Sequence, residues 1–281
     1  MTDLTPNVPD ALDDDDQDLD DMPPRRRRRG IYILPNLFTL GALFGGFYAV
    51  VMAMNARFDM AAVGIFCAAV LDSLDGRVAR MTNTQSAFGE QMDSLSDMVC
   101  FGAAPALIVY EWALKGLGKA GWIAAFVYCA CAALRLARFN TNIGVVDKRF
   151  FQGLPSPAAA ALVVGLVWVV NEAGYQQVYL DERLRWLAFF ITLYAGLTMV
   201  TNAPFYSFKD VNFKKSVPFI AVVAIALGFA VVSLHPPTVL FCFFLVYGFS
   251  GYFVYAKRKL KGRQASLIAT STDEPEEKGL H

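Results

Sequence analysis

Four aspartates lie close together in the stretch LDSLDGRVARMTNTQSAFGEQMDSLSD, which follows an apolar run: Asp72, Asp75, Asp93 and Asp97. A set of carboxylate oxygens without cysteine or histidine favours hard divalent cations such as Mg²⁺ or Mn²⁺. Four negative charges match two such cations, and paired cations recur where a nucleophile displaces a leaving group at phosphorus. The stretch therefore predicts a metal site that handles a phosphate group.

In the first half of this stretch, the residues that could bind a metal or a phosphate share one side of a predicted helix. At about 100° of rotation per residue, five residues share an arc of about 140°. They are two carboxylates, two very small residues and one arginine: Asp72, Asp75, Gly76, Ala79 and Arg80. The small residues leave room for a bulky polar ligand, and the guanidinium of Arg80 can clamp a phosphate through two hydrogen bonds.

A second helix is expected after the polar break at residues 82–86. Gly89, Asp93 and Asp97 are four residues apart and span about 80° of its surface. Two acidic faces joined by a short connection can point at each other. The simpler alternative is a solvated helix–turn–helix whose aspartates face water. Four mutually repelling anions persist most easily when cations neutralise them, and one carboxylate inside a membrane span costs about 2.5–3.5 kcal/mol.

Two other kinds of site do not fit the sequence. An EF-hand loop needs a glutamate eleven positions after its first aspartate, but Asn83 occupies that position. The chain has only two histidines, His235 and His281, in a proline-rich turn and at the end of the chain. A mechanism that depends on a catalytic histidine is therefore disfavoured.

The elements that carry these residues are predicted to be membrane-spanning helices. The chain has 281 residues, is 56% hydrophobic and has a mean hydropathy of +0.40. Long apolar runs recur along it, which is typical of membrane spans. We expect an all-α, polytopic membrane helix bundle with about eight transmembrane helices, near Tyr32–Met54, Met60–Met81, Asp93–Leu114, Ala120–Arg138, Ser156–Asn171, Trp186–Asn202, Val217–Leu234 and Val239–Ala256.

The distribution of charge predicts how this bundle is oriented. Residues 1–30 run from an acidic block into an arginine cluster and residues 257–281 are polar, so both are expected to be disordered cytoplasmic tails around a membrane domain at 31–256. With the arginine cluster inside the cell, 20 of the 25 lysines and arginines fall on the inner side. This bias is the one found in integral proteins of the cytoplasmic membrane. It places both termini and the aspartates at the cytoplasmic face.

The aspartate stretch resembles the signature of the CDP-alcohol phosphotransferase family. The matching pattern is Asp72-x-x-Asp75-Gly76-x-x-Ala79-Arg80, eight residues, then Gly89-x-x-x-Asp93-x-x-x-Asp97, with every fixed position present. The resemblance implies an integral membrane enzyme, usually a homodimer, that moves a phosphatidyl or related group from a CDP-linked donor to an alcohol and releases CMP. It implies no nucleic acid partner.

The family's residue roles can be carried over position by position. Asp72, Asp75 and Asp93 would be ligands of two divalent cations, Mg²⁺ or Mn²⁺, and Asp97 would be a further ligand or the general base for the acceptor hydroxyl. Gly76, Ala79, Arg80 and Gly89 would line the CDP site. Reasoning from the residues gave the same roles for the aspartates and Arg80, whereas the cytidine comes from the resemblance alone.

Three other stretches resemble the branch of the family that uses L-serine as the acceptor: LPNLFTLGALFGGFYAV, ALRLARFNT and FQGLPSPAAAA. The reaction they imply transfers a phosphatidyl group from CDP-diacylglycerol to L-serine. One alternative is the same chemistry with another alcohol, such as glycerol phosphate or inositol phosphate. An alternative from another class is a membrane transporter whose aspartates form a cation path, although no internal repeat supports it.

A zwitterionic acceptor requires a cation for its carboxylate. Arg135, Arg138 and Asn140 lie at the expected cytoplasmic end of the fourth span, at the depth of the aspartates, and are candidates to hold serine or the lipid phosphate. Lys148 and Arg149 are better explained by membrane orientation. Asn36 and Thr39 in the first span are candidate nucleotide contacts, although Asn36 equally suits a helix cap after Pro35.

Overall fold

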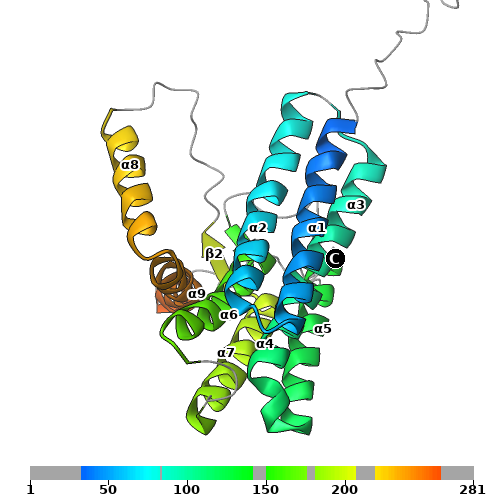
Figure 1. Ribbon diagram of the computed structural model, residues 1–281. Coiled ribbons are helices and arrows are strands. Elements are labelled where there is room, and N and C mark those ends of the chain that lie inside the picture. Colours follow the sequence, from blue (N-terminus) through cyan, green and yellow to red (C-terminus); the bar gives the residue numbers. More distant parts are fainter. Residues whose placement is uncertain (1–32, 83, 142–149, 176–180, 207–218, 261–281) are drawn as a thin grey trace, which may run out of the picture.

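The computed structural model describes residues 33–82, 84–141, 150–175, 181–206 and 219–260 (Figure 1). This part of the chain is almost entirely helical. Its main helices are α1 (Ile33–Met54), α2 (Phe58–Met81), α3 (Ala87–Asp97), α4 (Ala104–Trp112), α5 (Lys119–Thr141), α6 (Ser156–Glu172), α7 (Glu182–Val200), α8 (Phe219–Leu234) and α9 (Pro236–Leu260). A π-helical segment, Met98–Ala103, joins α3 to α4, and a short 3₁₀ helix, Leu114–Leu117, follows α4.

Two short strands pair beside the helices. β1 (Phe150–Gln152) runs antiparallel to β2 (Pro204–Tyr206), with Phe151 opposite Phe205. The all-α class is confirmed, and this strand pair is a local addition to it that joins the segment before α6 to the segment after α7.

Helices occupy all eight predicted positions, and five segments are long and apolar enough to cross a membrane: Pro35–Met54, Ala87–Trp112, Lys119–Thr141, Glu182–Val200 and Pro236–Lys257. The apolar helix α6 has 17 residues. α2 has 24 residues, but its second half carries the charged residues of the signature. An integral membrane protein is therefore confirmed, while eight crossings stay a prediction.

Small residues bring α1 and α2 into close contact. A Cβ built on Gly45 would lie 3.1 Å from the backbone oxygen of Gly64, and one built on Gly64 would lie 3.0 Å from that of Gly45. Membrane helices commonly pack through such small residues because their backbones can then approach closely. This contact fixes the position of α2, and with it Asp72 and Asp75, against α1.

The signature helices meet at one end of the bundle. α1 begins, α2 ends and α3 begins at this end, at the upper right of Figure 1. At the left of the same view α8 stands apart from α2 and joins α9. The predicted tails at residues 1–30 and 261–281, together with Lys148 and Arg149, lie outside the described residues.

Candidate active site

Three of the four signature aspartates form a single cluster. Asp72 and Asp75 come from α2 and Asp93 from α3, and each offers a carboxylate oxygen that lies within 4.8 Å of the other two. Asp75 is 5% exposed. Carboxylates this close repel one another strongly unless a cation lies among them, and their oxygens form a donor set that suits Mg²⁺ or Mn²⁺. The prediction that two helices turn acidic faces toward each other is confirmed.

Asp97 lies beside this cluster in a more enclosed position. Its carboxyl group is close enough to that of Asp72 for a side-chain hydrogen bond, and the guanidinium of Arg135 is near enough to attract its charge. Its Oδ1 atom is buried and has no hydrogen-bond partner among the described residues. A buried acceptor of this kind is costly unless a ligand, cation or proton satisfies it.

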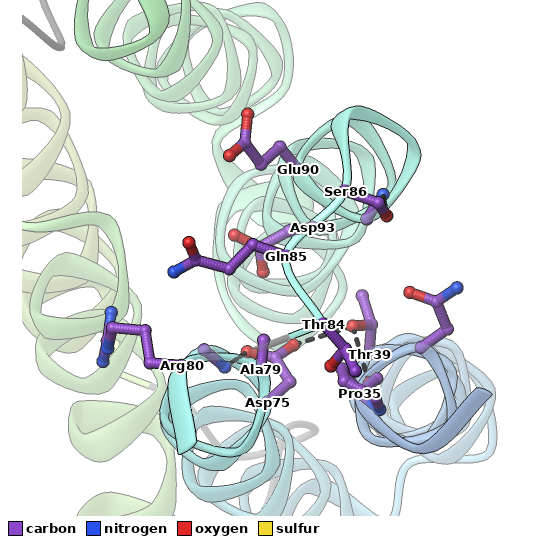
Figure 2. Close-up of a pocket in the computed structure, with 13 residues that line it drawn as sticks. Pro35, Thr39, Asp75, Ala79, Arg80, Thr84, Gln85, Ser86, Glu90 and Asp93 are labelled. Atoms are coloured by element: carbon purple, nitrogen blue, oxygen red, sulfur yellow. Dashed lines mark hydrogen bonds between the residues drawn. The ribbon is translucent and has the colours of Figure 1, made fainter. Parts of the chain in front are cut away.

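A pocket opens over the cluster between the ends of α1, α2 and α3 (Figure 2). All six residues predicted to hold the nucleotide line it, together with two of the clustered aspartates: Asn36, Thr39, Gly76, Ala79, Arg80, Gly89, Asp75 and Asp93. The structure thus brings these six residues together around one space, while their contacts with a nucleotide stay predictions.

Local hydrogen bonds explain the sharp turn at the mouth of the pocket. The Thr82 hydroxyl donates to the carbonyl of Val78 over 2.8 Å, and the Thr84 backbone N–H donates to the carbonyl of Ala79 over 3.0 Å. These bonds close the last turn of α2. Ser86 then caps α3, because its hydroxyl oxygen accepts the N–H of Gly89 over 3.1 Å.

Two glycines keep the pocket open. A Cβ on Gly89 would lie 3.3 Å from Ser86 Oγ and 3.4 Å from Asn36 Oδ1, so a side chain here would crowd α1. Among the described residues, a Cβ on Gly76 would come within 4 Å of the Arg80 guanidinium alone, at 3.9 Å. In Figure 2 Arg80 extends from α2 on the side opposite Thr39. Its guanidinium therefore lies beside the part of the pocket that the missing side chain of Gly76 leaves open.

Five further residues line the pocket and were not predicted as site residues: Pro35, Thr84, Gln85, Ser86 and Glu90. Figure 2 shows the Gln85 side chain on the side of the pocket that faces away from Thr39. A helix-cap pattern could have identified Ser86, since a serine directly before a new helix is a common start signal. Gln85 and Glu90 carry no comparable signal, because nothing in their spacing distinguishes them from solvated loop residues.

The residues predicted to hold serine or the lipid phosphate lie outside this pocket lining and have different hydrogen-bond partners from one another. Arg135 donates from Nη1 to the hydroxyl of Ser156, and its Nε is buried without a hydrogen-bond partner among the described residues. Asn140 donates to the Ser94 hydroxyl over 3.0 Å. The pocket described above is lined by none of Arg135, Arg138 and Asn140 in the described part of the chain.

Arg138 makes an extensive set of structural contacts. Nη1 donates to the carbonyl of Val200 over 3.2 Å and to Asn202 Oδ1 over 3.1 Å, while Nη2 donates to the carbonyls of Gln152 and Thr201, each over 3.3 Å. The guanidinium therefore joins the end of α5 to β1 and to the end of α7. Its predicted contact with a substrate stays a prediction, and Arg135 is the arginine that neighbours Asp97.

Comparisons with known proteins point to one family. The model of a family described as CDP-alcohol phosphatidyltransferase matches residues 32–200. A CDP-diacylglycerol–serine O-phosphatidyltransferase of Helicobacter pylori is 36% identical over 218 residues, which cover 78% of this chain and 90% of the relative. A protein of the same name from Methanocaldococcus jannaschii is 34% identical over 193 residues, or 69% of this chain and 83% of the relative. One from Mycobacterium leprae is 38% identical over 157 residues, covering 54% of this chain and 52% of the relative.

Proposed function

Because this chain belongs to the CDP-alcohol phosphatidyltransferase family, we propose that it transfers the phosphatidyl group of CDP-diacylglycerol to L-serine, giving phosphatidylserine and CMP. The observation that carries the proposal is the cluster of Asp72, Asp75 and Asp93, two of which, Asp75 and Asp93, line a pocket together with the whole predicted nucleotide set. Similar proteins from bacteria and an archaeon bear the name of this serine-using activity.

The donor set fits divalent cations. Oxygens of three aspartates lie within 4.8 Å of one another, and the fourth aspartate keeps a buried oxygen without a partner among the described residues. We assign Asp72, Asp75 and Asp93 as ligands of two Mg²⁺ or Mn²⁺ ions, and Asp97 lies beside these ligands. When bound, such ions polarise phosphoryl oxygens and neutralise the charge of the departing CMP.

Asp97 is suited to act as the general base. Its carboxylate takes the proton of the serine hydroxyl, and the serine oxygen then forms a bond to the phosphorus that carries the diacylglycerol. The bond from that phosphorus to the oxygen of CMP breaks, and the electron pair leaves with CMP, beside the guanidinium of Arg80. Since this is one direct displacement, we expect inversion of configuration at phosphorus.

Arg135 is the favoured contact for the acceptor carboxylate. It lies near Asp97, and its buried Nε has a proton to donate that no described residue accepts. A guanidinium binds a carboxylate through parallel hydrogen bonds, so a serine held by Arg135 would present its hydroxyl toward Asp97. Asn140 and Arg138, at the end of α5, then support the structure around this site through their hydrogen bonds to Ser94 and to the end of α7.

The assembly and orientation complete the proposal. We place the site and both termini at the cytoplasmic face of the cell membrane, because the inner side then carries most of the lysines and arginines. A homodimer is the form that the family resemblance implies.

The test of this function is the release of CMP by the purified protein in detergent micelles, with CDP-diacylglycerol and L-serine. We expect CMP and phosphatidylserine in equal amounts, loss of both with EDTA, and recovery with Mn²⁺ or Mg²⁺. Micelles have no second compartment, so transport cannot account for CMP release. No CMP release under any of these conditions would contradict the proposed function.

A further inference from the structure

We propose that Thr39 is a positioning residue for the metal site, acting on the carboxylate of Asp75 rather than directly on the nucleotide. The inference rests on the metal site of the proposed function and adds to it a residue of α1, which contributes no carboxylate to the site.

The hydroxyl of Thr39 has one proton and two acceptors within reach. Asp75 Oδ2 lies 2.8 Å from Thr39 Oγ1, and the backbone carbonyl of Pro35 lies 3.3 Å away, as the dashed lines in Figure 2 show. A hydrogen bond to a carboxylate is shorter than one to a neutral carbonyl and about twice as strong. The proton is therefore directed at Asp75.

This bond is shielded from water and fixes one side of the Asp75 carboxylate. Thr39 is 4% exposed and Asp75 is 5% exposed. The other oxygen, Oδ1, accepts the backbone N–H of Gly76. A carboxylate held at both oxygens cannot rotate freely, so its remaining lone pairs keep a constant direction toward the cluster with Asp72 and Asp93. Partners of this kind orient metal ligands, and their loss commonly lowers metal affinity about 10–100-fold.

Thr39 is itself held by the other metal-binding helix. Ser96 of α3 is 2% exposed, and its hydroxyl donates to the backbone carbonyl of Thr39 over 3.3 Å. Ser96 lies between Asp93 and Asp97 in the sequence. Thr39 thus makes one hydrogen bond to each of the helices whose aspartates must meet, and α1 sets their relative position.

The test compares Mn²⁺ binding by purified Thr39→Val and wild-type protein, with free Mn²⁺ measured by electron paramagnetic resonance and no substrate present. Valine keeps the shape of threonine and removes the hydroxyl. We expect the Mn²⁺ dissociation constant to rise about 10–100-fold. Thr39→Ser, which keeps the hydroxyl, should bind Mn²⁺ nearly as the wild type does.

Thr192 in α7 provides a matched control. It is fully buried, and among the described residues its hydroxyl donates only to the carbonyl of Ala188 in its own helix, over 2.7 Å. Thr192→Val therefore removes a buried hydroxyl from a helix that contributes no residue to the pocket or to the aspartate cluster in the described part of the chain. Unchanged Mn²⁺ affinity is expected for this variant. If Thr39→Val does not purify as folded protein, Ser96→Ala replaces it, and weaker Mn²⁺ binding is again expected.

Several outcomes would overturn the inference. One is wild-type Mn²⁺ affinity in Thr39→Val with a raised KM for CDP-diacylglycerol, which would make Thr39 a nucleotide contact. Another is equal loss of Mn²⁺ affinity in Thr39→Val and Thr192→Val, which would indicate general loosening of the fold. Absence of Mn²⁺ binding by the wild type would remove the metal site itself. A wild type that binds Mn²⁺ but releases no CMP with serine would contradict the proposed function alone.

Discussion

At the scale of single residues, the four aspartates divide into three that share one centre and one that lies beside it. Asp72, Asp75 and Asp93 bring their oxygens together, whereas Asp97 lies next to Asp72 and near Arg135. This arrangement favours the general-base role of Asp97 over the role of a ligand, an alternative that the sequence leaves open.

Asp97→Asn should therefore lower kcat about 10²–10⁴-fold, since asparagine cannot take the serine proton. Its Mn²⁺ dissociation constant should stay close to that of the wild type. Asp93→Asn is the matched variant, and it should weaken Mn²⁺ binding strongly because it removes a ligand oxygen. Both values can be measured on the same purified samples, by CMP release and by paramagnetic resonance. Equal loss of Mn²⁺ affinity in the two variants would make Asp97 a ligand instead.

Arg135→Lys separates the acceptor site from the donor site. Lysine keeps the positive charge but loses the planar pair of donors that fits a carboxylate. A hydrogen bond to a charged group contributes about 1.5–3 kcal/mol, so we expect the KM for serine to rise about 10–100-fold. The KM for CDP-diacylglycerol should change little. Initial rates of CMP release measure both constants when serine and CDP-diacylglycerol are varied in turn.

The exposed Arg57, at the connection between α1 and α2, supplies the control Arg57→Lys, for which both constants should match the wild type. A raised KM for CDP-diacylglycerol in Arg135→Lys, with an unchanged KM for serine, would instead assign this guanidinium to the lipid phosphate.

At the scale of elements, the site depends on how closely α1 packs against the segment that follows α3. A Cβ built on Gly46 would lie 2.8 Å from Cys100 Sγ and 3.0 Å from its Cα, so no side chain fits between these elements. The thiol of Cys100 also donates to the carbonyl of Ala42 over 3.2 Å. The packing of small residues therefore sets the distance between α1 and the helix that carries Asp93.

Gly46→Ala should lower the Tm of the purified protein, because overpacking of a well-packed site commonly costs about 1–3 kcal/mol. It should also weaken Mn²⁺ binding, since α1 would move away from α3. Gly228→Ala in α8 is the matched control: a Cβ there meets no atom of a described residue within 4 Å, and no loss of Tm is expected. A Gly46→Ala protein with wild-type Tm and Mn²⁺ affinity would contradict this account of the packing.

At the scale of the whole molecule, two sets of contacts between distant segments lie at two different ends of the helices. A Cβ on Gly116 would lie 2.6 Å from Arg185 Nη1, so the segment after α4 meets the start of α7. Arg138 joins the end of α5 to β1 and to the end of α7. The orientation prediction places Gly116 and Arg185 on the outer side of the membrane and Arg138 on the inner side. Each set of contacts therefore joins segments that are predicted to lie on the same side.

A reporter experiment tests this orientation. Alkaline phosphatase inserted at Gly116 should be active, because this position is predicted to lie outside the cytoplasm, and the same insertion at Gly153 should be inactive. Green fluorescent protein at the carboxyl terminus should fluoresce. Activity at Gly153 with none at Gly116 would reverse the orientation of the protein.

Sequence reasoning located the helices because a membrane span requires a long apolar run, and it located the break after Met81 because Thr82–Ser86 is polar. The acidic faces followed from helical periodicity alone. Other features carry no such signal. The four acceptors of Arg138 include three backbone carbonyls, which every residue type possesses, and the bond from Thr39 to Asp75 joins helices whose relative register depends on packing. Gln85 and Glu90 line the pocket only because of how the turn folds.

The central claim is that the aspartate pocket transfers a phosphatidyl group to serine, and one measurement tests it most directly. Purified protein with CDP-diacylglycerol and Mn²⁺ is offered L-serine, glycerol 3-phosphate or inositol phosphate separately, and CMP release is followed. We predict release with serine alone, in equal amount to the phosphatidylserine formed. Release with a phosphorylated alcohol and none with serine would contradict the assigned acceptor, and no release with any of them would contradict the assigned chemistry of the pocket.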